Sequence, residues 1–376
     1  INTTSNTCTI TLPSSAEVGD QIVFIDYLRT WGTNKIIIDS NGLNYQGEDD
    51  TYTVEYNTDG ETLSIVYADA TKGWIPLNDD EVTDAPVAPP TQKALFGYGY
   101  TGSHVSMTNL VSSSGVVAAD VTGVGTARAG LAAATYGLDK AIFGYGNTGP
   151  KVSMTNLVSN SGVVAADVTG VGTARANLAA ANYGTDKAIF GYGTTGSQSS
   201  LTNLVSNSGV VASDTTGVGT ARNLLAATGY GTDKAIFGYG SISGSILSMT
   251  NLVSNVGVVG TDVTGVGTTR YGVGAASYGS TGQAIFAYGY NSGQLSMSNL
   301  ISNTGVQSSD VTGVGTGRYA LAAAGYGGDK AIFGYGADGN LSMTNLVSNS
   351  GVVATDVTGV GTGRTYLAAA GYSISA

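Results

Sequence analysis

Residues 140–146, Lys-Ala-Ile-Phe-Gly-Tyr-Gly, form a run that recurs almost unchanged along three quarters of the chain. Its phenylalanine appears six times, and successive copies lie 47, 47, 47, 49 and 47 residues apart. These residues are Phe96, Phe143, Phe190, Phe237, Phe286 and Phe333. A second marker, Asp-x-Thr-Gly-Val-Gly-Thr-x-Arg, begins at Asp120, Asp167, Asp214, Asp262, Asp310 and Asp356. A fixed period of this size predicts a repeat architecture.

One period contains four segments of strand length. In the copy that holds the quoted run they are Leu131–Tyr136, Ala141–Tyr145, Val152–Val158 and Gly162–Asp167. Each is bounded by glycine, asparagine or aspartate, which are typical turn residues, and the frequent glycines disfavour a helix. Four strands in this length correspond to one blade of a β-propeller. Six copies therefore predict an all-β, six-bladed propeller over residues 93–376.

The two ends of the array predict how the ring closes. The first copy opens at Lys93 without the Ala-rich strand, and the last copy adds that strand at residues 366–372. We therefore expect Leu367–Gly371 to pair with Leu95–Tyr98, because an open solenoid would carry distinct capping repeats instead. The Ala-rich strand should be the innermost one, since small side chains suit a narrow centre.

Composition excludes several classes of site. Charged residues make up 11% of the 376 residues and hydrophobic residues 42%, which argues against disorder. A single cysteine, Cys8, and a single histidine, His104, exclude a disulfide scaffold, a cysteine zinc cluster and a multi-histidine site, so no cofactor is expected. No apolar run approaches 18 residues, which predicts no membrane insertion. Residues 1–92 carry a net charge of −12 and the rest +1, so phosphate neutralisation on nucleic acid is not expected.

Residues 1–77 are predicted to form a separate all-β module, a small β-sandwich or β-roll. Short strand-like runs occur at Cys8–Leu12, Gln21–Tyr27, Lys35–Asp39, Thr51–Tyr56 and Leu63–Tyr67. Turns are expected at Asn41-Gly42 and Asp59-Gly60. The only tryptophans, Trp31 and Trp74, are expected to anchor its core. Residues 78–92 are acidic and then proline-rich, which predicts an extended linker.

The repeat resembles the Kelch blade. The shared order is an arginine, a small apolar strand, the glycine-containing strand (Gly97-Tyr98-Gly99 in the first copy) and the Asp-x-Thr-Gly turn. Where the family has a tryptophan, this chain has valine, for example Val124. The resemblance covers residues 93–376 and concerns the fold.

The amino-acid sequence of the repeats, and that of the segments Trp31–Asn34 and Tyr67–Trp74, also resembles virion proteins of marine tailed bacteriophages. In those proteins such arrays sit on tail fibres or related appendages. The resemblance implies a structural or host-recognition role, a location in the virion and outside the cell, and other virion proteins as partners. A homotrimer is a further hypothesis from the fibre resemblance, since a module of this size gains stability by oligomerising.

One arginine precedes each Ala-rich strand. Six such residues could surround one channel mouth and bind an anion; alternatively, each pairs with an aspartate between blades and is structural. The six are Arg128, Arg175, Arg222, Arg270, Arg318 and Arg364. The aspartates of the second marker are expected to cap their own turns, because six equivalent copies do not make one catalytic site. Calcium binding there is weakly supported, since one carboxylate per blade falls short of a full shell.

The segments after Gly-Tyr-Gly differ from copy to copy. They are Tyr100–His104, Asn147–Lys151, Thr194–Gln198, Ser241–Ile246, Tyr290–Gln294 and Ala337–Asn340. All are expected on one face together with the arginines. Divergent loops on a uniform scaffold favour ligand recognition, whereas free drift of exposed loops is the alternative. The candidate ligand contacts are His104, Asn147, Lys151, Gln198, Tyr290, Asn291 and Asp338.

An enzyme is not expected from this sequence. A copper oxidase needs clustered histidine and tyrosine ligands, and a glycosidase needs two poised carboxylates. Every acid of the propeller except Asp338 belongs to a repeated turn. We therefore expect a non-enzymatic virion protein that recognises a host receptor or surface glycan. The alternative is a secreted or cell-surface carbohydrate-binding, lectin-like propeller.

Overall fold

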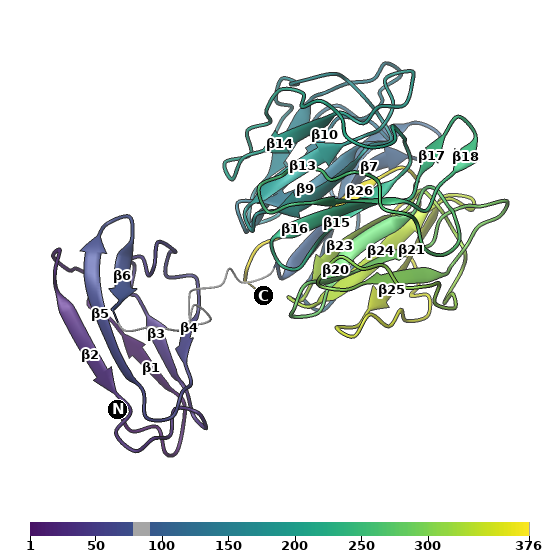
Figure 1. The fold of residues 1–376 in the computed structure, drawn as a ribbon. Coiled ribbons are helices and arrows are strands. Elements are labelled where there is room, and N and C mark those ends of the chain that lie inside the picture. The colour runs from purple at the N-terminus through teal and green to yellow at the C-terminus, as the bar shows by residue number, and fades with distance from the viewer. Residues whose placement is uncertain (78–90, 376) are drawn as a thin grey trace. The chain divides into compact units, whose positions relative to one another are not determined.

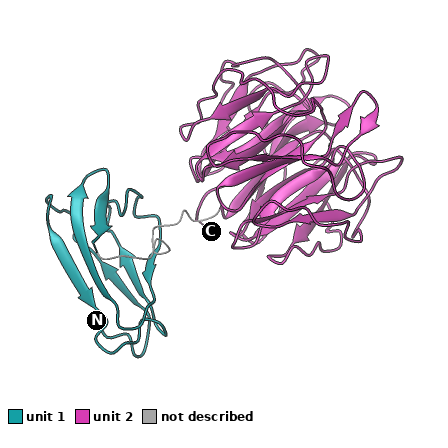
Figure 2. Ribbon diagram, in the orientation of Figure 1, with its two compact units in different colours: residues 1–89 teal, residues 90–376 magenta. Residues whose placement is uncertain are grey.

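A computed structural model describes residues 1–77 and 91–375, and these residues form strands and turns without a helix (Figure 1). The all-β prediction is confirmed. Two compact units divide the chain, residues 1–89 and residues 90–376 (Figure 2). Of the predicted linker, residues 78–90 lie outside the described residues. Among the described residues, no helix has the length and apolar character needed to cross a membrane.

Unit 1 consists of two three-stranded sheets. The first has the order β1 (Cys8–Thr11), β3 (Ile36–Asp39), β4 (Val54–Tyr56), and the second β2 (Gln21–Ile25), β5 (Thr62–Asp69), β6 (Gly73–Pro76). Trp31 and Trp74 are 0% and 1% exposed and lie in one core cluster, so their predicted role is confirmed. Strand β6 was not predicted, because it is short, begins with glycine and ends with proline. It pairs with β5 through an irregular register between Tyr67 and Asp69.

Unit 2 consists of six antiparallel three-stranded sheets, numbered here in the order of their middle strands. Sheet 1 contains β26 (Ala368–Tyr372), β7 (Lys93–Tyr100) and β8 (His104–Val111), and sheet 2 contains β9 (Ala132–Tyr136), β10 (Lys140–Gly144) and β11 (Thr155–Val158). Sheet 3 contains β12 (Ala179–Tyr183), β13 (Lys187–Gly191) and β14 (Thr202–Val205), and sheet 4 contains β15 (Ala226–Tyr230), β16 (Lys234–Gly238) and β19 (Thr250–Val253). Sheet 5 contains β20 (Gly274–Tyr278), β21 (Gln283–Ala287) and β22 (Ser298–Ile301), and sheet 6 contains β23 (Ala322–Tyr326), β24 (Lys330–Gly336) and β25 (Leu341–Val347). A small hairpin, β17 (Ser241–Ile242) and β18 (Ser245–Ile246), lies in the sheet 4 loop.

The two ends of unit 2 share sheet 1. Strand β26 pairs antiparallel with β7, with Ala369 opposite Phe96 and Tyr372 opposite Lys93. The predicted pairing of the last strand with the first is therefore confirmed. It removes a free strand edge that would otherwise offer its backbone groups to other chains.

The prediction of four strands per repeat is wrong: each sheet has three. In sheet 2 the segment predicted as the fourth strand, Gly162–Asp167, contributes only Val164, which forms an isolated bridge with Val158. The physical reason is a competing side chain. Asn156 Nδ2 donates to the Ala165 carbonyl at 3.0 Å, so an amide occupies the acceptor that a fourth strand would offer to its neighbour.

The six sheets follow one another in a closed cycle of contacts. The Ala-rich first strands touch in the order β9, β12, β15, β20, β23, β26 and β9 again. A separate hydrophobic cluster fills each of the six junctions. Within it a tyrosine of one sheet meets a phenylalanine of the next: Tyr145 and Phe190 have ring centroids 5.2 Å apart. In Figure 1, β9, β15 and β26 lie near the middle of unit 2, and the third strands β14 and β25 lie at its margin.

The junctions explain a glycine that recurs in the middle strand. A Cβ on Gly144 would lie 2.6 Å from Phe190 Cζ, and the residue opposite Gly144 is Ala132. Sheet 5 exchanges the two residue types, with Ala287 opposite Gly274. One of the two facing positions is therefore always glycine, which leaves room for the phenylalanine of the next sheet.

Candidate functional site

A closed cycle of backbone hydrogen bonds joins the six sheets at one end of their first strands. It is made by the residues two positions after each arginine: Gly130, Asn177, Leu224, Gly272, Ala320 and Tyr366. Each N–H donates to the carbonyl of the preceding member at 2.7–2.9 Å, and Gly130 N–H donates to the Tyr366 carbonyl. All six have a left-handed backbone, with φ between 52° and 63°. We call these residues the backbone ring.

The divergent loops lie beside this ring. The residue after each arginine forms an isolated bridge with the residue after Gly-Tyr-Gly in its own sheet, as Ala129 does with Asn147 and Tyr271 with Tyr290. Three positions per sheet therefore gather at this end, and we call them the variable face. Its residues are Ala129, Gly130, Asn147, Ala176, Asn177, Thr194, Asn223, Leu224, Ser241, Tyr271, Gly272, Tyr290, Tyr319, Ala320, Ala337, Thr365, Tyr366 and Tyr100.

The other end of the first strands is nearly uniform. There the hairpin turns read Gly-x-Asp-Lys in four of the copies, and each aspartate pairs with its neighbouring lysine, as Asp139 does with Lys140 at 2.8 Å. Backbone bonds also link these turns between sheets, for example Gly137 N–H to the Asp186 carbonyl at 2.7 Å. At the two ends of the first strands, the sequence differences between the six copies are therefore concentrated at the variable face.

The six arginines lie beneath this face and are closed off from solvent. Arg128 is 0% exposed; its Nε donates to the Tyr145 carbonyl at 2.8 Å and its Nη2 to Asn156 Oδ1 at 2.6 Å. Its guanidinium carbon lies 4.4 Å from the centroid of the Tyr98 ring, and Nη1 lies 3.8 Å from Asp167 Oδ1. The other five, Arg175, Arg222, Arg270, Arg318 and Arg364, are also fully buried over a tyrosine ring. The arginines therefore do not form an anion-binding ring of exposed guanidinium groups. They have a structural role between the sheets, which is the alternative that the sequence left open.

The marker aspartates cap a turn of the neighbouring repeat, which corrects the expectation that each caps its own. Asp167 accepts hydrogen bonds from Thr126 N–H at 3.0 Å and from Thr126 Oγ1 at 2.6 Å, 41 residues earlier in the chain. Asn156 Nδ2 of its own sheet donates to it at 2.9 Å. Burial opposes ionisation, but these bonds and Arg128 hold the pKa of Asp167 below its ordinary value. The aspartates therefore tie consecutive sheets together.

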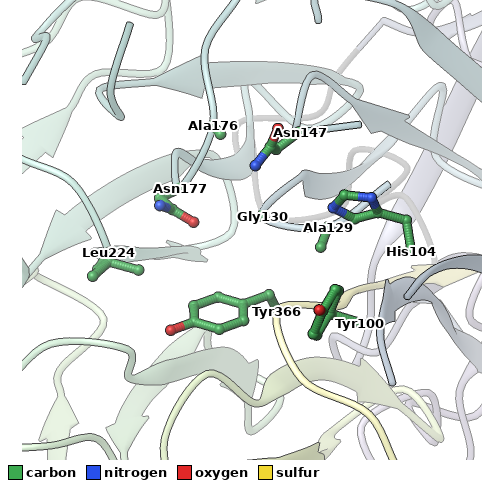
Figure 3. Close-up of a pocket in the computed structure, with 9 residues that line it drawn as sticks. All are labelled: Tyr100, His104, Ala129, Gly130, Asn147, Ala176, Asn177, Leu224 and Tyr366. Atoms are coloured by element: carbon green, nitrogen blue, oxygen red, sulfur yellow. The ribbon is translucent and has the colours of Figure 1, made fainter. Parts of the chain in front are cut away.

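Two of the predicted contact residues, His104 and Asn147, line one pocket of about 300 Å³ on the variable face. Tyr100, Tyr366 and Asn177 are the other large polar residues around it. Figure 3 shows the two tyrosine rings, the imidazole and the two amides arranged around an open centre. The His104 and Tyr100 rings meet edge to face, with centroids 5.5 Å apart.

A third predicted residue, Tyr290, belongs to an aromatic wall made with Tyr271 and Tyr319. Ring centroids lie 5.4 Å apart for Tyr290 and Tyr271, and 5.3 Å for Tyr290 and Tyr319. Burial, followed by the neighbouring Tyr319 and Tyr271, raises the pKa of Tyr366. Tyr366 also lines the pocket, and its N–H donates at 2.9 Å to the carbonyl of Ala320, the residue after Tyr319, so the pocket and the aromatic wall are neighbours along the backbone ring.

The other predicted contact residues belong neither to the lining of the pocket nor to the aromatic wall. Asn291 Nδ2 donates to the Thr269 carbonyl at 2.8 Å. Lys151 forms a backbone bridge with Asn147 and Gln198 with Thr194, while Asp338 lies in an exposed turn. Residues that sequence reasoning missed are Tyr271, Tyr319, Tyr366, Asn177 and Leu224. The signal that would have found them is the difference between copies at the two positions after the arginine.

No family model and no curated protein matches this sequence.

The variable face carries no formal charge. None of its eighteen residues is aspartate, glutamate, lysine or arginine. Within residues 1–77 and 91–375, no group of three or more histidine, cysteine, aspartate or glutamate side chains is arranged to hold a metal ion. The chemistry that this face offers is aromatic stacking and neutral hydrogen bonding.

Proposed function

We propose that the chain is a non-enzymatic phage virion appendage protein that recognises a host-surface receptor or glycan. Its unit 2 acts as a six-bladed, Kelch-like β-propeller, and the variable face is its binding surface. The single observation that carries this proposal is the gathering of the divergent positions of six near-copies around one backbone ring. Binding specificity is commonly placed on variable loops held by a rigid scaffold.

The propeller interpretation is supported by closure at several levels. Strand β26 completes the sheet begun by β7, six hydrophobic junctions alternate with six sheets, and the backbone ring returns to its first member. A propeller of this kind leaves short and protected strand edges. The order of the arginine, glycine and aspartate markers supports the Kelch-like subtype.

The virion assignment is supported by the resemblance of the repeats and of Trp31–Asn34 and Tyr67–Trp74 to phage appendage proteins. The geometry of the variable face bears on recognition and not on location. A secreted or cell-surface lectin would use the same face, so it is the second candidate. Locating the chain in purified phage particles by immunogold labelling separates the two.

Recognition is tested by binding of the full chain to host cells and to an array of surface glycans. We expect binding that is lost when the side chains of two loops, 147–151 and 290–294, are replaced by alanine with their glycines kept. Replacement of the hairpin turn residues 185–187 at the opposite end is the control and should leave binding intact. Unchanged binding by the two-loop variant contradicts the proposed function.

A further inference from the structure

The variable face is not six-fold symmetric, although the scaffold beneath it nearly is. All five of its tyrosines lie on three consecutive sheets, 5, 6 and 1. They are Tyr271, Tyr290, Tyr319, Tyr366 and Tyr100. All three of its asparagines, Asn147, Asn177 and Asn223, lie on sheets 2, 3 and 4. The face is therefore divided into an aromatic half and an amide-bearing half.

The two halves meet at the pocket. Tyr366 and Tyr100 come from the aromatic half, and Asn147 and Asn177 from the other, and all four line the same 300 Å³ space (Figure 3). Aromatic rings on one side and amide donors and acceptors on the other suit a ligand with an apolar face and hydroxyl groups on its edges. A pyranose ring has this chemistry.

The electrostatic surroundings favour an uncharged ligand. The six arginines below the face are fully buried. Five of them each contact an asparagine and an aspartate oxygen, and Arg222 donates to the Tyr239 and Thr220 carbonyls. In the loops around the face the charged residues are Lys151 and Asp338, and neither lines the pocket. His104 is the one basic side chain that lines the pocket, so a carboxylate or sulfate placed there would lose water without gaining a lysine or arginine partner.

We propose that the variable face is a single composite site for a neutral oligosaccharide, one per chain. This inference rests on the proposed recognition function and specifies its ligand class and stoichiometry. The aromatic wall of Tyr271, Tyr290 and Tyr319 provides the stacking surface for one sugar ring. The pocket holds another, with Asn147 and Asn177 as hydrogen-bonding partners.

The test is calorimetric titration of the full chain with neutral hexose hexasaccharides (malto-, cello- and manno-) and with oligogalacturonate and oligoalginate as anionic counterparts. We expect one neutral ligand per chain, with an affinity that is unchanged between low and high salt. Tyr290→Ala should weaken binding about tenfold, and Tyr290→Trp should retain it, because stacking needs the ring and not the hydroxyl. Tyr27→Ala removes an exposed tyrosine of unit 1 and is the matched control.

Each outcome separates this inference from the function on which it rests. Preferential binding of the anionic oligosaccharides, or a strong salt dependence, overturns the neutral ligand class while leaving recognition in place. A stoichiometry near six overturns the composite site in favour of one site per repeat. Absence of binding to every oligosaccharide, with host-cell binding that Tyr290→Ala does not alter, overturns the ligand class too. Absence of both glycan and cell binding by the unmodified chain rejects the proposed function itself.

Discussion

Replacing one marker aspartate, Asp167→Asn, tests the connection between consecutive sheets. The substitution keeps the size of the side chain but removes the charge beside a fully buried arginine. At the 3.8 Å between Arg128 Nη1 and Asp167 Oδ1, Coulomb's law gives about 4 kcal/mol for an effective dielectric constant of about 20 and about 1 kcal/mol in water. Asp167 is 29% exposed and Thr126 loses a charged acceptor, so we expect a loss of about 2–3 kcal/mol in the free energy of unfolding.

The assay is urea unfolding of the full chain at pH 7 followed by two probes. Trp31 and Trp74 both lie in unit 1, so tryptophan fluorescence excited at 295 nm follows that unit and should not change. Near-ultraviolet circular dichroism follows unit 2, which holds 17 of the 22 tyrosines. The exposed Asp338→Asn is the control and should stay within about 0.5 kcal/mol of the unmodified chain.

The effect also has a defined pH dependence. Burial disfavours the ionised form of Asp167, but Thr126, Asn156 and Arg128 together hold its pKa below 3.8. The stabilisation is therefore complete above the unfolded-state pKa and is lost as the pH falls through the folded-state value. The deficit of Asp167→Asn should therefore shrink as the pH is lowered below about 3.9, the ordinary pKa of an aspartate. A cost no larger than that of Asp338→Asn at pH 7, or a deficit that does not shrink as the pH is lowered, refutes the reasoning.

Two further predictions concern the junctions between sheets. Gly144→Ala should destabilise unit 2 by about 1–3 kcal/mol through overpacking. Adding Ala132→Gly should recover most of this loss, because the double variant has the same arrangement as the natural Gly274 and Ala287 pair. A double variant that is less stable in urea unfolding than Gly144→Ala contradicts this. Burial raises the pKa of Tyr98 to about 12 despite the nearby Arg128. The difference in 295 nm absorbance between the unmodified chain and Tyr98→Phe should therefore develop near pH 12, and a difference that develops at pH 10 is inconsistent with the packing.

The repeat period and the closing strand could be predicted because both follow from comparing near-identical segments along the chain. The phenylalanine spacing fixes the number of sheets, and the Ala-rich strand missing before Lys93 reappears at residues 366–372. The fourth strand was predicted wrongly, because the same alternating pattern fits a segment whose acceptor is taken by the Asn156 side chain. The sequence also does not indicate that Asp167 caps the turn of Thr126 in the preceding repeat, because every repeat contains the same possible partners.

The site was predictable only in its outer part. The loops after Gly-Tyr-Gly differ between copies, and this difference predicts His104, Asn147 and Tyr290 as candidate ligand contacts. The backbone ring was missed because only two of its six members, Gly130 and Gly272, carry the residue typical of a left-handed backbone. Leu224 adopts φ of 54° there because neighbouring sheets hold both its backbone groups, which no local pattern indicates.

The closure of unit 2, on which the variable face depends, is tested most directly by a disulfide across its seam. Tyr100 and Thr365 exchange two backbone hydrogen bonds, of 2.9 and 3.0 Å, and such a pair has Cα atoms about 5.5 Å apart, which suits a disulfide. We predict that Tyr100→Cys with Thr365→Cys, in a Cys8→Ser background, oxidises to a monomer that migrates faster on a non-reducing gel and reverts on reduction. Thr194→Cys with Thr365→Cys should give no such band. Failure of the seam pair to form this intramolecular bond would contradict the closed ring.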